Sequence, residues 1–229
     1  MKVAIMQPYF FPYIGYFQLI NAVDVFVVYD DVNFIKQGWI SKNRVLVNKQ
    51  VVDIILQLNG ASSFIKINEI TLGKNRLKLL KTIEQAYKKA PFFNSAFPIV
   101  SEILTFNENN LAVFLTNSLI KISGYLKINT KIIISSDINK NNLLKGKDKV
   151  LEICKKLNAL DYINAIGGIE LYKKEDFIEN NIKLCFIKTK MEGYNQFDYD
   201  FVPGLSIIDI LMFNSVEEIN LMLNQYELI

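Results

Sequence analysis

A unit of strand, loop, helix and strand at the start of the chain constrains the fold more than any other feature of the sequence. Residues 3–6 form a short apolar run typical of a buried strand. Pro8 and Pro12 exclude a helix from the turn that follows, because each proline disfavours the helical conformation in the residue before it. A helical pattern spans 13–22 and a second apolar strand spans 25–29. This short connection predicts two neighbouring parallel strands of an α/β sheet.

The second half of the chain repeats the alternation of strands and helices. Apolar runs predict strands at 131–136, 162–165 and 183–188, and helical patterns at 147–158 and 170–180 separate them. Such alternation is typical of α/β folds in which helices cover a mostly parallel sheet.

Other segments add a hairpin and a helical part to this sheet. Alternating hydrophobicity over 39–58 predicts a small β-hairpin that turns near Asn48 and Lys49. Helical patterns follow at 75–89, 98–106 and 109–126, and the last ones lie at 206–212 and 216–225. A chain of 229 residues with 51% hydrophobic residues can bury one large core. We expect a single domain over 1–229 with an inserted helical lobe at approximately 73–128.

The charge balance and the cysteines exclude several classes of protein. Lys and Arg number 26 against 23 Asp and Glu, and a net charge of +3 does not indicate a general nucleic-acid binder. Cys154 and Cys185 lack the spacing of a zinc site or a disulfide framework. No apolar run approaches about 18 residues, so we expect no membrane insertion and a cytoplasmic location.

The chain contains no histidine. Ser-His-Asp and Cys-His hydrolases, catalytic zinc bound by histidine, and the HxGH motif of nucleotidylyltransferases all require an imidazole. Acid and base chemistry therefore falls to Asp, Glu, Lys, Tyr or Cys.

Polar and aromatic side chains crowd the loop after the first strand. That loop lies at the carboxyl edge of the predicted sheet, where open α/β folds bind ligands. Tyrosine faces and hydroxyl groups suit a sugar or a base, and a glutamine amide both donates and accepts hydrogen bonds. The aromatic rings would alternatively cap the sheet edge. The predicted substrate-binding residues of this segment are Gln7, Tyr9, Tyr13, Gly15 and Tyr16.

Two adjacent carboxylates follow the second strand. Asp30 and Asp31 would serve simply as turn residues, or would orient an amine or a ribose hydroxyl, hold Mg²⁺, or accept a proton from an attacking amine. Lys36 would neutralise a phosphate. We predict that these three residues are catalytic.

Further candidates lie in the hairpin and at the ends of later strands. Trp39, Asn43 and Arg44 would anchor a ring and contact a phosphate or carboxylate, or would be ordinary hairpin residues. The last candidates follow predicted strands, where free backbone N–H groups bind an anion and where tight turns and helix caps are equally common. They are Ser135, Gly167, Gly168 and Tyr172.

Two sets of later residues have a mainly structural interpretation. Cys154 shares a helix face with Val150 and Leu157 and is predicted to lie in the core. The lysines around it are predicted to form a solvated helix face with its entry loop, and they are Lys145, Lys147, Lys149, Lys155 and Lys156. Ser206 and Asp209 would be a helix N-cap and a surface carboxylate, or a late polar pair of the site.

Long motifs resemble the WbqC-like family, which is associated with O-antigen and other surface-polysaccharide genes. They are MQPYFFPYIGYFQLI, DVFVVYDDVNFIKQGWISKNR, YKKAP, KDKVLEICKKLNALDYINAIGG and FVPGLSIIDILMFN. The first block also resembles, more distantly, the nucleotidylyltransferase layout, with YIGYF in place of the HxGH stretch. The resemblance implies a Rossmann-like sheet.

The resemblance further implies transfer of glycine, or a related acyl group, onto a nucleotide-linked amino sugar. The acyl donor stays open among charged tRNA, a thioester and an acyl-adenylate made from ATP with Mg²⁺, and the oligomeric state stays open as well. The alternatives are a nucleotidylyltransferase-like enzyme without histidine and a non-catalytic nucleotide-sugar binding protein.

Overall fold

The protein is built around a six-stranded sheet with strand order β10-β9-β8-β1-β2-β7. The computed structural model describes residues 1–197 and 200–229. Five strands run parallel, and β10 is antiparallel to β9. The strands are β1 (Lys2–Met6), β2 (Val25–Val28), β7 (Lys131–Ile134), β8 (Asp161–Ala165), β9 (Lys183–Thr189) and β10 (Tyr226–Leu228). The Rossmann-like α/β fold predicted from the sequence is confirmed.

The order in which successive strands are added to the sheet reverses at β1. β1 pairs with β2 on one side and with β8 on the other, so the chain first builds toward β7 and then crosses back over β1. The carboxyl ends of β1 and β8 therefore diverge into loops that leave in opposite directions. Ligands bind at such switch points in open α/β sheets.

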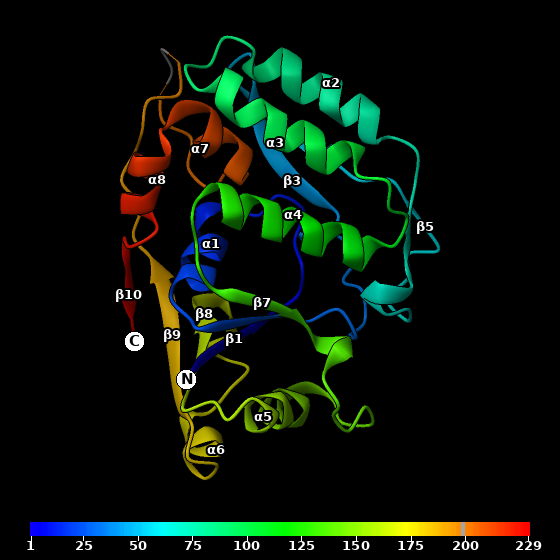
Figure 1. The fold of residues 1–229 in the computed structure, drawn as a ribbon, viewed down its shortest axis with the longest axis vertical. Coiled ribbons are helices and arrows are strands. Elements are labelled where there is room, and N and C mark those ends of the chain that lie inside the picture. The colour runs from blue at the N-terminus through cyan, green and yellow to red at the C-terminus, as the bar shows by residue number, and fades with distance from the viewer. Residues whose placement is uncertain (198–199) are drawn as a thin grey trace.

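Helices cover both faces of the sheet (Figure 1). One face carries α5 (Gly146–Lys156) and α6 (Lys174–Ile178), which bury Val150, Cys154 and Phe177. The other face carries α1 (Ile14–Asn21) and the helices of the middle and the end of the chain. These are α2 (Arg76–Tyr87), α3 (Phe93–Thr105), α4 (Leu111–Tyr125), α7 (Ile207–Phe213) and α8 (Val216–Met222).

The predicted helical part packs on the same hydrophobic core as the sheet. Ile83, Val100 and Phe114 belong to one buried cluster with Phe17 of α1 and Ile208 of α7. Whether residues 73–128 form a separate lobe stays a prediction, and this shared core favours one unit.

The predicted hairpin is confirmed as β3 (Lys42–Val47) and β4 (Gln50–Ile55). Asn48 and Lys49 join the two strands with positive φ angles of 48° and 68°. Two successive positive φ values suit the right-handed twist of a two-residue hairpin turn. This hairpin fixes the position of Asn43 and Arg44 at its start.

Several predicted boundaries were wrong. Helix α3 begins at Phe93 instead of Pro98, so Pro98 lies inside the helix rather than at its first position. The strand at 131–136 ends at Ile134 and continues as a 3₁₀ turn, Ser135–Asp137. The helix at 170–180 is confined to α6.

The sequence patterns did not predict the short elements. These are β10, β5 (Leu58–Asn59), β6 (Thr71–Leu72) and the 3₁₀ turns Ile67–Glu69 and Ile166–Gly168. Each is too short to show a hydrophobic period.

Candidate functional site

The loop after β1 is held in place by segments from distant parts of the chain. The Asn43 amide donates to the carbonyl oxygens of Phe10 and Phe11 at 3.0 and 2.8 Å. The Ser206 hydroxyl also donates to Phe11, at 2.8 Å, and the Phe10 N–H donates to the Trp39 carbonyl at 2.9 Å. Phe11 has a φ of 42°, an unusual conformation for this residue type. The hairpin and the start of α7 therefore fix the shape of the loop.

Two of the predicted binding residues, Gly15 and Tyr16, support this loop from the start of α1. The Tyr16 side chain is buried, and its hydroxyl donates to the Gln7 carbonyl at 2.8 Å. Burial is the main cause that raises the Tyr16 pKa well above its usual value, and the nearby Tyr9 hydroxyl adds to the shift. A Cβ at Gly15 would lie 2.4 Å from both the Tyr13 ring and the Thr189 hydroxyl, so the helix approaches its neighbours closely here. Neither Gly15 nor Tyr16 lines either of the two hollows beside this loop.

An aromatic hollow of about 320 Å³ lies beside the loop. Tyr13 and Trp39 are 39% and 40% exposed, which is high for large aromatic side chains. The Arg44 guanidinium lies 5.4 Å from the Trp39 ring and donates to the Gly204 carbonyl at 3.3 Å. The hollow is lined by Tyr9, Pro12, Tyr13, Trp39, Asn43 and Gly204.

A second hollow of about 350 Å³, the sheet-edge hollow, lies at the switch point between β1 and β8. Tyr9 lines both hollows, so they are neighbours separated by this side chain. The sheet-edge hollow is lined by Ile5, Met6, Gln7, Tyr9, Tyr29, Ile35, Asn164, Ala165, Gly167, Gly168, Leu171 and Tyr172. The structure thus brings Gln7 and Tyr9 together with Gly167, Gly168 and Tyr172.

Asn164 and Tyr29 line the sheet-edge hollow although the sequence patterns did not single them out. The Asn164 side chain is buried against Gly168, where an added Cβ would lie 2.4 Å from Asn164 Nδ2. The Tyr29 hydroxyl is buried and has no hydrogen-bond partner among residues 1–197 and 200–229. Both residues end strands that adjoin β1, and this position is the signal that could have identified them.

Asp30 and Asp31 both follow the carboxyl end of β2 and face the turn that follows β7. Each carboxylate accepts several hydrogen bonds. Asp30 accepts from the Ser136 N–H and hydroxyl at 2.9 and 2.7 Å and from Asn68 at 3.1 Å, all uncharged donors. Asp31 accepts from the Ser135 hydroxyl at 2.7 Å. Neither carboxylate lines the aromatic hollow or the sheet-edge hollow.

Two buried lysines bind Asp31, and the sequence analysis missed both of them. Lys140 and Lys149 place their ammonium groups 3.0 and 2.8 Å from Asp31 Oδ2. Burial opposes ionisation of Asp31, but the hydrogen bonds from Lys149, Ser135 and Lys140 outweigh it and lower the Asp31 pKa. Asp31 is therefore a weak base and a strong anchor.

The prediction that Lys149 belongs to a solvated helix face was wrong. Lys149 lies on the same face of α5 as Val150, Ile153 and Cys154, all of which are buried. Its spacing from Ile153 is the four-residue step of that face, a signal present in the sequence. The prediction for Cys154 was correct: the thiol is buried, and burial raises its pKa to about 12.

The late polar pair, Ser206 and Asp209, is buried rather than exposed at the surface. Ser206 caps α7 by accepting from the Ile208 N–H at 3.2 Å. Asp209 is completely buried, and Gln196 Nε2 lies 3.1 Å from Asp209 Oδ2. Burial raises the Asp209 pKa to about 7, although hydrogen bonds from Gln196 and Tyr194 oppose the shift.

Lys36 is exposed and follows Ile35, which lines the sheet-edge hollow. Within the described part of the chain, no group of three or more Cys, Asp or Glu side chains is arranged to hold a metal ion. No helix of the described residues is long and apolar enough to cross a membrane.

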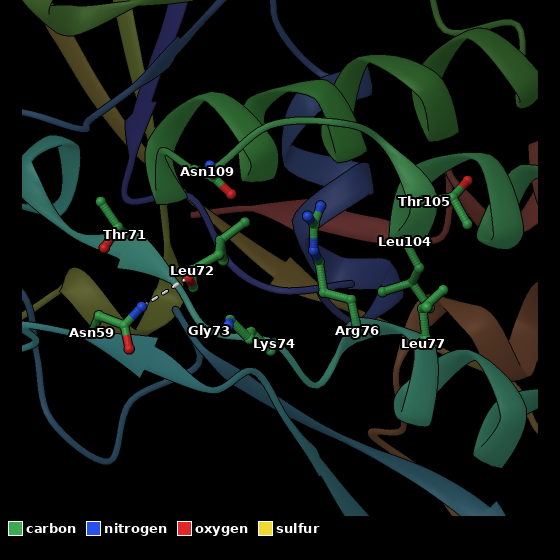
Figure 2. Close-up of a pocket in the computed structure, with 10 residues that line it drawn as sticks. All are labelled: Asn59, Thr71, Leu72, Gly73, Lys74, Arg76, Leu77, Leu104, Thr105 and Asn109. Carbon is green, nitrogen blue, oxygen red and sulfur yellow. Dashed lines mark hydrogen bonds between the residues drawn. The ribbon is translucent and has the colours of Figure 1, made fainter.

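A hollow of about 580 Å³, larger than the two at this site, lies away from them, between β6 and the facing ends of α2 and α3 (Figure 2). Figure 2 shows Arg76 extending from the start of α2 into the group of lining residues. Its guanidinium already donates to the Phe106 carbonyl and lies 5.4 Å from the Phe114 ring, so it has a structural role. The predicted site residues all lie elsewhere.

The fold and the two hollows define a Rossmann-like α/β protein with cavities where this class binds its ligands. Residues 7–221 match the WbqC-like protein family, and the chain belongs to that family. It is 29% identical over 217 residues to a curated protein of Mycobacterium tuberculosis (strain ATCC 25618 / H37Rv), "Uncharacterized protein Rv1507c", with 92% of each chain covered. No solved structure gives a significant match to the chain.

Proposed function

We propose that the protein is an N-aminoacyl transferase that joins a glycyl group to the amine of a nucleotide-linked amino sugar in surface-polysaccharide synthesis. The observation that carries this proposal is the pair of neighbouring hollows that share Tyr9. One hollow is lined mainly by aromatic residues and the other adds several polar groups to an apolar lining, an arrangement that suits a sugar-bearing acceptor beside an activated acyl donor. Membership of the WbqC-like family supports the same assignment.

The aromatic hollow would hold the ring systems of the nucleotide-linked sugar. Flat faces of Tyr13 and Trp39 stack on a base or on the apolar face of a sugar. The Arg44 guanidinium, held against Trp39, would contact the phosphate groups. Lys36 would add positive charge at the neighbouring rim.

The sheet-edge hollow would hold the reacting carbonyl. Amide formation passes through a tetrahedral oxyanion that needs hydrogen-bond donors placed in advance. The hollow offers the side-chain amides of Gln7 and Asn164, the Tyr29 hydroxyl, and the backbone at Gly167 and Gly168. Burial, and then the negative charge of Asp31, raise the Tyr29 pKa, so its hydroxyl stays protonated and able to donate.

The reaction needs one proton acceptor. The C–N bond of the amide forms while the bond between the acyl carbon and its leaving group breaks, and the amine loses one proton. Of the two aspartates, we assign the role of proton acceptor to Asp30. Its hydrogen-bond partners are uncharged, whereas Asp31 is paired with two lysines. Asp30 and Ser136 line neither hollow, so the proton would have to leave the hollows and reach Asp30 through the exposed Ser136 hydroxyl, which donates to it.

Incubation with an amino sugar linked to dTDP or UDP tests the proposal. The protein is supplied with glycyl donors of three kinds, which are charged tRNA, a thioester, and free glycine with ATP and Mg²⁺, and products are followed by mass spectrometry. A glycyl mass increase on the sugar supports transfer. Release of pyrophosphate with nucleotide exchange identifies a nucleotidylyltransferase instead, and a ligand-induced rise in melting temperature without product identifies a binding protein.

Trp39→Ala should weaken binding of the nucleotide-linked sugar by about tenfold or more, since stacking on an aromatic side chain is worth roughly 1–3 kcal/mol. We expect KM to rise while kcat changes little, and calorimetric titration measures the loss of affinity directly. Phe64→Ala is the matched control, because Phe64 is an exposed aromatic residue, 90% accessible, outside both hollows. Equal affinities for the two variants would remove Trp39 from the site.

Gly168→Ala should lower kcat/KM by about tenfold or more, because the new methyl group displaces a side chain that must be placed precisely. A Cβ at Gly168 would lie 2.4 Å from Asn164 Nδ2, whereas a Cβ at Gly167 would meet no atom within 4 Å. Gly167→Ala is therefore the neighbouring control and should retain nearly full kcat/KM. Similar losses in both variants would contradict a role for the Asn164 position.

A further inference from the structure

The edge of the sheet at β7 is open to pairing. β7 pairs with β2 alone among the described strands. The Lys131 N–H donates to Asp24 in the β2 direction, at 3.1 Å. Because N–H groups alternate sides along a strand, those of Ile132 and Ile134 point away from the sheet. Unpaired edge groups of this kind are a template for another strand.

Apolar side chains accompany this open edge. A hollow of about 390 Å³ lies between β7 and α4, and three successive isoleucines, Ile132, Ile133 and Ile134, line it. Ile120 of α4 lines the same hollow and is 48% exposed. Figure 1 shows β7 running alongside α4. The edge therefore combines free backbone groups with apolar surface that a second strand would cover.

The opposite edge of the sheet is protected. There β10 carries Glu227, which pairs with Lys188 and Lys190 of the adjoining segment at 3.4 and 2.6 Å. Charged side chains on an edge strand discourage pairing with another chain. The lack of charge within Ile132–Ile134 makes β7 the edge that favours association.

We propose that β7 pairs antiparallel with β7 of a second copy of this chain about a two-fold axis, which joins the two six-stranded sheets into one. The proposal goes beyond the proposed function and does not depend on it. The outward N–H groups favour the register that uses both of them within the strand. Only one register within the strand pairs Ile132 with Ile134 of the partner subunit in both directions, and it places Ile133 next to its own copy on the axis.

Charge complementarity supports a second copy of this chain as the partner of β7. Lys131 and Asp137 are both exposed and flank the isoleucines at opposite ends. The antiparallel arrangement brings Lys131, at the start of β7, to the end of the partner's strand, where the 3₁₀ turn carries Asp137 of the partner subunit. The two-fold axis creates this pair twice, with opposite charges together each time.

Light scattering during size-exclusion chromatography tests the association. The wild-type chain should elute with twice the mass of one chain. Lys131→Glu should weaken the dimer by about tenfold or more, because like charges then meet twice. Lys131→Glu combined with Asp137→Lys should restore it, and Lys127→Glu, at an exposed lysine outside the strand, should have no effect. A monomeric wild-type chain, or a dimer that Lys131→Glu leaves intact, would overturn the proposal.

A cysteine cross-link tests the register. Residues on the axis form a pair without hydrogen bonds, with Cα atoms roughly 4.5 Å apart, a separation that allows a disulfide. Ile133→Cys should therefore give a dimer on a non-reducing gel after mild oxidation. Ile132→Cys should not, since its neighbour is Ile134 of the partner subunit, and wild-type protein controls for Cys154 and Cys185. A cross-link through Ile132→Cys in place of Ile133→Cys would exclude this register.

Discussion

Asp31→Asn should lower the free energy of unfolding by about 3–5 kcal/mol, the usual cost of removing one partner from a buried ion pair. Lys140 and Lys149 would lose the carboxylate that neutralises them, and their side chains are only 0% and 6% exposed. Urea unfolding at pH 7, followed by circular dichroism, measures the loss. The site would retain its fold only if this cost stays below the total stability, so Asp31 belongs to the framework as well as to the candidate site.

Two further variants separate charge from shape. The partners of Asp30, Ser136 and Asn68, are uncharged, so Asp30→Asn leaves no buried charge without a counter-ion. It should lower the free energy of unfolding less than Asp31→Asn does. The triple variant Asp31→Leu, Lys140→Met and Lys149→Met removes all three charges and should recover most of the lost stability, since well-packed apolar replacements of buried ion pairs are often neutral. A triple variant no more stable than Asp31→Asn would mean that geometry, rather than charge, holds this region.

Asp209→Asn should remove a pH dependence of stability between about pH 4 and 7. The native pKa of Asp209, about 7, lies above its usual value of 3.8, so the folded protein favours the neutral acid. The stability that the neutral acid contributes is fully present below about pH 4 and is lost as pH rises to about 7. The wild type should lose roughly 1.4 kcal/mol per pH unit relative to the variant across this range, on the order of 4 kcal/mol in total.

Urea unfolding at half-unit steps from pH 4 to 8 measures this difference. The slope is compared rather than the absolute stability, because an asparagine also alters the hydrogen bonds with Gln196 and Tyr194. Asp53→Asn, at an exposed position of β4, should leave the wild-type slope unchanged. A parallel pH profile for wild type and Asp209→Asn would contradict a carboxylate that is protonated in the folded state.

The parallel sheet could be predicted because its strands are continuous apolar runs separated by helical periods. β2 buries all of its residues and β1 buries its central residues 3–5, whereas an amphipathic helix such as α5 buries one face and exposes the other. β10 could not be predicted in this way, because its three residues owe their conformation to pairing with β9. The early start of α3 was missed because Pro98 was taken as the first residue of the helix, the position that proline favours, whereas it lies in the second turn.

The candidate site could be predicted in part. The residues nearest the first strand, such as Gln7 and Tyr9, line a hollow as expected, since the loop position follows directly from the sheet topology. The ion pairs of Asp31 depend on residues more than 100 positions away, and no local pattern encodes such a pairing. Asn164 is an intermediate case, because its position near the end of a predicted strand could be seen in the sequence, whereas the pairing of that strand with β1 follows only from the tertiary structure.

The contact between the first loop and α7 has a consequence for the order of assembly. The Ser206 hydroxyl that holds the Phe11 carbonyl comes from a residue 195 positions later in the chain. During synthesis, β1, α1 and β2 emerge long before this partner, so the sheet can begin to form while the loop lacks one of its supports. The shape of the binding loop is therefore completed only when the end of the chain has been synthesised and α7 has joined the core.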